Sequence, residues 1–170
     1  MKWNLTRTQY MADFIVVPIY VIVAFTVALF RESAQLSWLL YFMLGWCIWT
    51  LMEYIIHRHG FHFYYKRDHA RHHVKPKAWI GTTPLVSTSL LAIIWGLCAI
   101  ISNNIGLGSI IFIGFCFGYY SYIGIHYLIH HSKLAIINTL RHHHELHHRN
   151  PRINYGVSVR FWDYIFRTKA

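Results

Sequence analysis

Four long apolar runs dominate the sequence and restrict the folds open to it. They extend from Phe14 to Phe30, Leu36 to Ile56, Trp79 to Ile101 and Ile105 to about Ile129. Each approaches or exceeds the roughly 20 residues that an α-helix needs to cross a hydrocarbon core of about 30 Å. Only 13% of the 170 residues are charged and 55% are hydrophobic, which agrees with this pattern. We therefore predict an all-α, multi-pass integral membrane protein built as a bundle of four transmembrane helices.

The runs are not separated by a repeat, a low-complexity linker or a soluble region, so we predict that residues 1–170 form one membrane-embedded domain. The first run shares features with a signal peptide, but it is long for one, contains Pro18 and is followed by no small-residue cleavage site. We expect a spanning helix there. Cys47, Cys98 and Cys116 lie within the apolar runs, where we expect them to pack between helices.

Basic residues gather at one set of helix ends, which predicts the orientation of the bundle. Lys2 and Arg7 precede the first run, six basic residues lie between Arg58 and Lys77, and seven lie between Lys133 and the C-terminus. Only Arg31 falls on the other side. Because Lys and Arg mark the cytoplasmic side, we predict cytoplasmic termini and a cytoplasmic long loop. The net charge of +10 suits an anionic membrane surface, and we expect no nucleic-acid partner.

The 14 histidines are confined to three short segments, 57–73, 126–131 and 142–148. In the predicted topology, all three segments lie at the cytoplasmic edge of the membrane. The first 56 residues and the whole third run contain none. This distribution predicts a histidine-rich helical cap on the cytoplasmic side, in which imidazoles from distant parts of the chain meet.

The segments "HARHH" and "HELHH" share one spacing, with histidines at i, i+3 and i+4. Such residues lie on one face of an α-helix, so each trio can converge on a metal ion. The six residues concerned are His69, His72, His73, His144, His147 and His148.

Two further pairs extend the pattern. In "HYLIHH", His126 and His130 are four apart and share a face, whereas His131 is rotated away. In "HRHGFH", His57 and His62 are five apart, which is not one face of a regular helix. We predict that the helix ends or deforms near Gly60, which would let both side chains turn inward.

Together these positions supply ten imidazoles, more than one zinc site would use, so we predict two metal ions with up to five imidazoles each. Imidazole suits Zn, Cu, Fe and Ni alike. Histidines at a membrane edge can also be hydrogen-bonded or snorkelling side chains, but so many titratable groups are costly there unless something holds them. His59, His142 and His143 break the spacing pattern, and we expect them to face solvent.

Three residues are candidates for orienting an imidazole: Glu53, His131 and Asp163. Glu53 stands one helical turn before His57. It can orient that ring, bind a metal directly or reach the interface as a snorkelling carboxylate, and we favour the first role.

The segments "EYIIHRHGFH", "HARHH", "HYLIHH" and "HELHHRNPRINYGVSVRFWDYIF" resemble the fatty acid hydroxylase and sterol desaturase superfamily of integral membrane di-iron oxygenases, especially its fatty acid hydroxylase branch. The resemblance extends from about Gly45 to the C-terminus. It implies two iron ions, for which zinc can substitute in a purified protein, and O₂ as co-substrate, with no catalytic residue beyond the metal ligands. The implied ligands are the ten histidines selected by spacing: His57, His62, His69, His72, His73, His126, His130, His144, His147 and His148.

The sequence also departs from the family pattern. Ile123 stands where the family often has Asp, so a hydrogen bond to the site is lost or is supplied by Tyr122 or Tyr127. Arg167 replaces a usual Gly, and Pro84 is what remains of a usual pair of prolines. These departures affect the assignment to a substrate branch of the family more than the prediction of a metal site, because all ten histidines are present.

The resemblance implies hydroxylation of a lipid acyl chain held in the membrane. The chain is short and carries no fused cytochrome-type domain, so we expect a separate electron-transfer protein. Basic residues around the site could bind a lipid headgroup or an acidic electron-transfer partner, although such residues also follow from ordinary placement at cytoplasmic helix ends. They include Arg71, Lys75, Arg149 and Arg152.

Other functions stay open at this point. A sterol or acyl-chain desaturase of the same superfamily would begin with the same hydrogen abstraction. A membrane metal transporter or metal store is a non-enzymatic alternative, although a transporter should place ligands near the membrane midplane, where this chain has no histidine. A scaffold with a saturated structural metal is the third.

Overall fold

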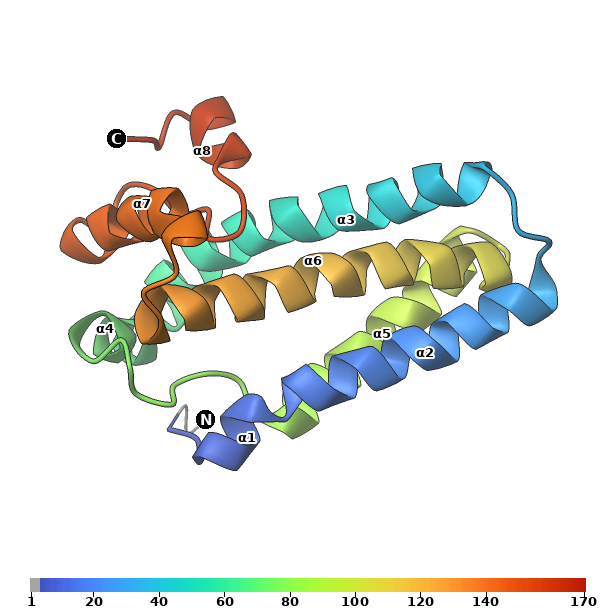
Figure 1. The fold of residues 1–170 in the computed structure, drawn as a ribbon, viewed down its shortest axis with the longest axis horizontal. Helices are drawn as coiled ribbons and strands as arrows, with labels where there is room; N and C mark the ends of the chain where they lie inside the picture. Colours follow the sequence, from blue (N-terminus) through green and yellow to red (C-terminus); the bar gives the residue numbers. More distant parts are fainter. Residues whose placement is uncertain (1–3) are drawn as a thin grey trace. The chain divides into compact units, whose positions relative to one another are not determined.

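The computed structural model describes residues 4–170, so Lys2 lies outside the described part of the chain. Helices account for nearly all regular structure in this part (Figure 1). One isolated bridge pairs Asn4 with Ile80. In chain order the helices are α1 (Arg7–Met11), α2 (Asp13–Arg31), α3 (Ser37–Ile55), the π-helix η1 (Ile56–Tyr64), α4 (Lys66–Val74), α5 (Pro84–Ile101), α6 (Ile105–His131), the short 3₁₀-helix η2 (Ala135–Ile137), α7 (Asn138–Arg149) and α8 (Phe161–Ile165).

Four helical segments are long and apolar enough to cross a membrane: Arg7–Arg31, Ser37–Tyr64, Pro84–Ile101 and Ile105–His131. The prediction of an all-α protein with four spanning helices is confirmed. Large apolar side chains along α2, such as Ile15, Ile22 and Phe30, are exposed. In a spanning helix, such side chains face lipid.

The third span begins later than its apolar run indicated. Trp79 to Thr83 are not helical, and Leu5 N–H donates to the carbonyl of Trp79 at 2.8 Å. Thr83 has extended backbone angles and Pro84 is the first helical residue. Proline suits this position because its missing N–H would have no partner in the first helical turn. Hydropathy alone therefore placed the start of α5 five residues too early.

The chain packs as two compact units, Met1–Trp49 with Trp79–Tyr120, and Thr50–Ala78 with Ser121–Ala170. In the first unit, α2, α5 and the adjoining parts of α3 and α6 pack through aromatic side chains. Tyr20 of α2 contacts both Trp95 and Phe112, whose rings stack with centroids 5.4 Å apart.

Two glycines bring α3 and α6 into very close contact in the first unit. A Cβ atom on Gly45 would lie 1.8 Å from the carbonyl oxygen of Ile111, and one on Gly114 would lie 1.9 Å from that of Phe42. The contact is reciprocal, because each glycine faces the backbone three residues before the other. Small residues permit this approach, which is a usual way for membrane helices to associate without a hydrophobic driving force.

The first unit also buries a carboxylate. Asp13, at the start of α2, accepts hydrogen bonds from Ser87 Oγ at 2.7 Å and from Tyr119 OH at 2.5 Å. Its side chain is 9% exposed. The two hydroxyl groups replace the water that the carboxylate loses, so these bonds connect α2 to α5 and α6.

The second unit contains η1, α4, the end of α6, α7 and α8. Its apolar core comprises Ile129, Ile137 and Val157, with Tyr122, Ile125, Leu128 and Leu140 packed against it. This core joins α6 and α7 to the segment that precedes α8. All 14 histidines belong to this unit.

Candidate metal centre

The ten histidines selected from the sequence gather in the second unit as two groups of five, and within each group the nearest nitrogen atoms all lie within 4.8 Å of one another. The first group is His57, His62, His69, His73 and His147, and the second group is His72, His126, His130, His144 and His148. The side chains come from η1, α4, α6 and α7.

The deformation predicted near Gly60 is confirmed. Residues Ile56–Tyr64 form a π-helix, in which hydrogen bonds join residues five apart. His57 and His62 are therefore on one face, and their rings stack with centroids 5.2 Å apart. The five-residue spacing of His57 and His62 thus matches the hydrogen-bond spacing of the π-helix.

Neither of the two predicted histidine trios contributes all its members to one group. On α4, His69 and His73 join the first group while His72 turns to the second. On α7 the division is reversed, because His144 and His148 join the second group and His147 joins the first. In both helices the i, i+4 pair serves one group and the i+3 residue serves the other, so α4 and α7 each contribute to both.

Within the first group the Nε2 atoms converge. The Nε2 atoms of His57 and His69 are 3.0 Å apart, those of His62 and His147 are 3.0 Å apart, and those of His69 and His73 are 3.0 Å apart. Two nitrogens bound to one ion at about 2.1 Å and at right angles would be separated by about 3.0 Å. The observed distances equal that separation.

The second group repeats this arrangement. The Nε2 atom of His126 is 3.1 Å from those of His72 and His130. His144 Nε2 is 3.2 Å from that of His130 and 2.9 Å from that of His148. Each group therefore brings five ring nitrogens within 4.8 Å of one another, an arrangement that could hold a metal ion.

Backbone carbonyls orient two rings of the first group. His57 Nδ1 donates to the carbonyl of Tyr155 at 2.6 Å, and His147 Nδ1 donates to that of Ile153 at 2.7 Å. A neutral imidazole that carries its proton on Nδ1 has its lone pair on Nε2. Both rings therefore offer Nε2 to the centre of the group.

Burial keeps the imidazoles of His72, His147 and His148 neutral. It lowers the pKa of His72 to about 2 and those of His147 and His148 to about 3, and neighbouring imidazoles add to the effect. A hydrogen bond between the His148 ring and the backbone of His73 partly offsets this, and the His73 ring makes the converse bond. Because only the neutral ring can bind a metal, these shifts suit metal binding at physiological pH.

Glu53 fastens the C-terminal segment to α3. Its carboxylate accepts hydrogen bonds from the backbone N–H groups of Val157 at 2.7 Å and Ser158 at 2.8 Å, and also from Ser158 Oγ. Glu53 is 3% exposed. Its role in orienting His57 is thus indirect, because it holds the segment whose Tyr155 carbonyl accepts from that ring.

Asp163 fastens the same segment from the other side. It accepts from the N–H groups of Tyr155 at 2.8 Å and Gly156 at 2.9 Å, and it bonds His143 Nε2 at 2.9 Å. Burial alone would raise the pKa of Asp163, but the bonds from His143, Thr168 and the backbone outweigh it and lower that pKa.

The prediction that His143 faces solvent is wrong. Its side chain is 4% exposed and is paired with Asp163, whereas His59 and His142 are exposed as expected. Side-chain spacing could not find this pairing, because Asp163 stands 20 residues after His143. His131 lies outside both groups and stacks on Tyr127, with ring centroids 4.6 Å apart.

Tyr122 directly precedes Ile123, and Ile123 is the position at which the family pattern often has Asp. The Tyr122 ring stacks on His126 at an angle of 17° with centroids 5.7 Å apart. His126 is therefore supported by an aromatic contact with Tyr122.

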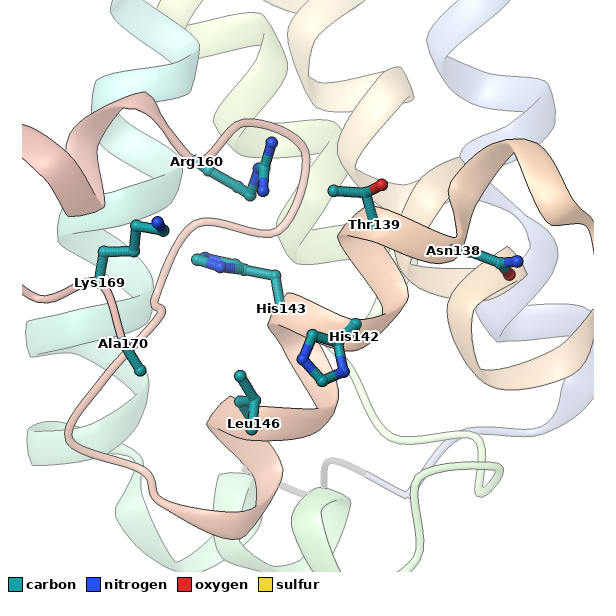
Figure 2. A pocket seen from close by; sticks show the side chains of 8 residues that line it. All are labelled: Asn138, Thr139, His142, His143, Leu146, Arg160, Lys169 and Ala170. Atoms are coloured by element: carbon teal, nitrogen blue, oxygen red, sulfur yellow. The ribbon is translucent and has the colours of Figure 1, made fainter.

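A pocket of about 460 Å³ lies between α7 and the C-terminal segment that carries Arg160, Lys169 and Ala170 (Figure 2). Figure 2 shows the His143 ring reaching from α7 toward the segment that carries Arg160 and Lys169. The lining contains no member of the two histidine groups, although six of its eight residues have polar or basic side chains. The lining residues are Asn138, Thr139, His142, His143, Leu146, Arg160, Lys169 and Ala170.

Comparison with known proteins identifies relatives. Human fatty acid 2-hydroxylase is 32% identical over 145 residues, which cover 75% of this chain and 38% of the human protein. The ceramide very long chain fatty acid hydroxylase Scs7 of Saccharomyces cerevisiae is 30% identical over 158 residues, which cover 81% of this chain and 40% of the yeast protein. The chain thus spans about two fifths of the length of these relatives.

A solved structure of full-length Scs7p, in which only the hydroxylase domain is visible, aligns with a TM-score of 0.83 at 29% sequence identity. The alignment covers 97% of this chain and 68% of that chain. The family model for fatty acid hydroxylase matches residues 42–168, which include both histidine groups and the segment that orients them. The chain therefore belongs to the fatty acid hydroxylase family.

Proposed function

We propose that this chain is a membrane oxygenase that hydroxylates a lipid acyl chain, using O₂, electrons from a separate protein and two iron ions held by the two histidine groups. The observation that carries the proposal is the convergence of ten imidazoles from four helices into two groups of five. Relatives named as fatty acid and ceramide hydroxylases support the reaction and the lipid class.

The donor set fits iron. Each group offers neutral nitrogen donors at the mutual distances expected around one ion, and imidazole is a usual ligand of iron. The two iron ions would supply the activation of O₂ for insertion into a C–H bond. We assign the ten histidines as ligands and assign no further catalytic residue.

The surrounding residues prepare the donors. The carbonyls of Tyr155 and Ile153 hold the Nδ1 protons of His57 and His147, which keeps the Nε2 lone pairs available. Burial keeps additional protons off the rings of His72, His147 and His148. Glu53 and Asp163 act as positioning residues, because they hold the segment that carries both carbonyls.

We further propose that both units belong to one domain, which is supported by a family match that runs through both. We place the termini and the histidine groups on the cytoplasmic side, because the basic residues gather there in the sequence. Exposed basic residues of the second unit would then meet an acidic electron-transfer protein or a lipid headgroup. The candidates are Arg71, Lys75, Arg149 and Arg152.

Metal analysis tests the centre. Protein purified anaerobically with iron should contain about two iron ions per chain. His72→Ala removes a ligand of the second group and His147→Ala one of the first, so each should abolish O₂-dependent lipid oxidation without preventing membrane insertion. His59→Ala is the matched control, because His59 is exposed and lies outside both groups.

Lipid extracts from cells with and without the gene test the reaction. Mass spectrometry should show acyl chains that gain one oxygen atom. Loss of two hydrogen atoms would instead identify a desaturase. Activity that survives both histidine substitutions, or a single tightly held ion per chain, would contradict the proposed centre.

A further inference from the structure

We infer that the two histidine groups bind their metal ions unequally, with the ion of the first group held more tightly and that of the second group more exchangeable. This inference rests on the proposed metal-binding function. It concerns a property that neither the ligand count nor the ligand type predicts, because both groups contain five histidines. The difference lies in what holds the rings.

Two rings of the first group are fixed by the backbone. His57 and His147, which are 3% and 0% exposed, donate from Nδ1 to the carbonyls of Tyr155 and Ile153 at 2.6 and 2.7 Å. These bonds hold the tautomer and the ring orientation that a metal ion needs. The ion therefore meets two donors that require no rearrangement.

The segment that carries the two carbonyls is itself held in place. Glu53 accepts from the N–H groups of Val157 and Ser158, and Asp163 accepts from those of Tyr155 and Gly156. The turn is also tightly packed, since a Cβ atom on Gly156 would lie 2.0 Å from the carbonyl oxygen of Val159. Two buried carboxylates thus stabilise the support of the first group.

The second group lacks this support. Among residues 4–170, its one ring with a backbone partner is His148, which bonds the backbone of His73. That contact does not favour either group, because the His73 ring bonds the backbone of His148 in return. The His57 and His147 bonds have no counterpart in the second group.

His144 increases the expected difference in metal affinity between the two groups. It is 1% exposed, and within the described chain its Nδ1 atom has no hydrogen-bond partner. When Nε2 binds a metal ion, the ring proton must reside on Nδ1, where no acceptor awaits it. A buried donor without an acceptor is costly, so metal binding at the second group carries a penalty that the first group avoids.

Bonds of this kind typically change metal affinity by about 10- to 100-fold. Titration of the metal-free full chain with cobalt(II), read from its visible absorption in competition with a chelator, should therefore show two binding steps. We expect their dissociation constants to differ by at least about tenfold. Two steps within about twofold of each other would overturn the inference and leave the proposed two-metal function intact. Binding of one ion or none would overturn both.

Matched variants assign the steps. His62 and His130 are half-buried ligands of the first and second group, and neither ring bonds a backbone carbonyl in the described structure. His130→Ala should retain the tight step, and His62→Ala should retain the weak step. The reverse result would overturn the inference. If either variant fails to fold, His130→Gln and His62→Gln replace them.

A third variant tests the support of the first group. Glu53→Gln keeps the shape of the side chain but weakens its bonds to Val157 and Ser158. It should weaken the tight step and leave the weak step unchanged. Equal weakening of both steps would indicate a general structural role and would contradict the assignment.

Discussion

The reciprocal contact of Gly45 and Gly114 predicts a strongly non-additive pair of substitutions. Each alanine would place a Cβ atom 1.8 or 1.9 Å from a backbone carbonyl oxygen of the other helix, where real Cβ atoms stay beyond 3.0 Å. The helices must therefore separate locally by about 1.1 to 1.2 Å. Backbone atoms cannot rotate away as a side chain does, so the separation also weakens neighbouring contacts between α3 and α6.

Overpacking of this kind costs about 3 kcal/mol, at the upper end of the usual range. At about 2–4 °C per kcal/mol for a protein of this size, Gly45→Ala or Gly114→Ala alone should lower the melting temperature by about 6–12 °C. The double variant should cost little more than either single one, because one separation relieves both clashes. The coupling energy should thus be about 2–3 kcal/mol.

Thermal unfolding of the four proteins in one detergent measures this cycle. Gly96→Ala is the control, because a Cβ atom there would have no neighbour within 4 Å and alanine has the higher helix propensity, so its melting temperature should not fall. Strictly additive losses would refute the reasoning, since they would mean that the two contacts yield independently. Single losses as small as that of the control would refute the close approach itself.

Two further predictions concern buried titratable groups. The metal-free protein should lose stability as the pH falls from about 6.5 toward about 3. The upper value is the ordinary pKa of histidine, and the lower value is the pKa of His147 and His148 in the folded protein. Stability falls in this range because the unfolded chain binds protons that the folded chain excludes. A melting temperature that is constant between pH 7.5 and 5 would contradict this. Asp13→Ala removes the acceptor of Ser87 and Tyr119 and should destabilise the protein by about 2 kcal/mol; thermal unfolding measures the loss, and an unchanged melting temperature would show that these bonds contribute nothing net.

Much of the fold was predictable because lipid imposes a simple rule on composition. A chain cannot leave backbone groups unpaired in hydrocarbon, so each apolar run of sufficient length becomes a helix. The bounds of α2, α3 and α6 follow the runs closely. The start of α5 does not, because a local choice at Thr83 and Pro84 determined it and hydropathy contains no information on that choice.

The membership of the site was predictable from side-chain spacing, but the distribution of the ligands was not. Histidines at i, i+3 and i+4 share a face, yet a face is wide enough to serve two centres, and α4 and α7 each divide their trios between both groups. That division depends on how the two helices pack, which no local spacing encodes.

The supporting contacts were the least predictable part. The acceptors of His57 and His147 are backbone carbonyls, which every residue possesses and which leave no trace in the sequence. Glu53 and Asp163 were recognised as candidates for orienting a ring. Their action through Val157, Ser158, Tyr155 and Gly156 became visible only once the C-terminal segment was folded against them.

The π-helix η1 links the spacing of His57 and His62 to the winding of the helix that carries them. In an α-helix of 3.6 residues per turn, five residues would leave the second side chain about 140° away from the first. If the segment kept its length but wound as an α-helix, His62 would turn away from its partners, whereas loss of one residue together with α winding would leave the pair four apart and on one face. Exposed positions such as His59 and Phe63 can therefore vary in side chain, whereas the spacing of His57 and His62 and the winding of η1 can change only together if the chain is to keep five donors in the first group.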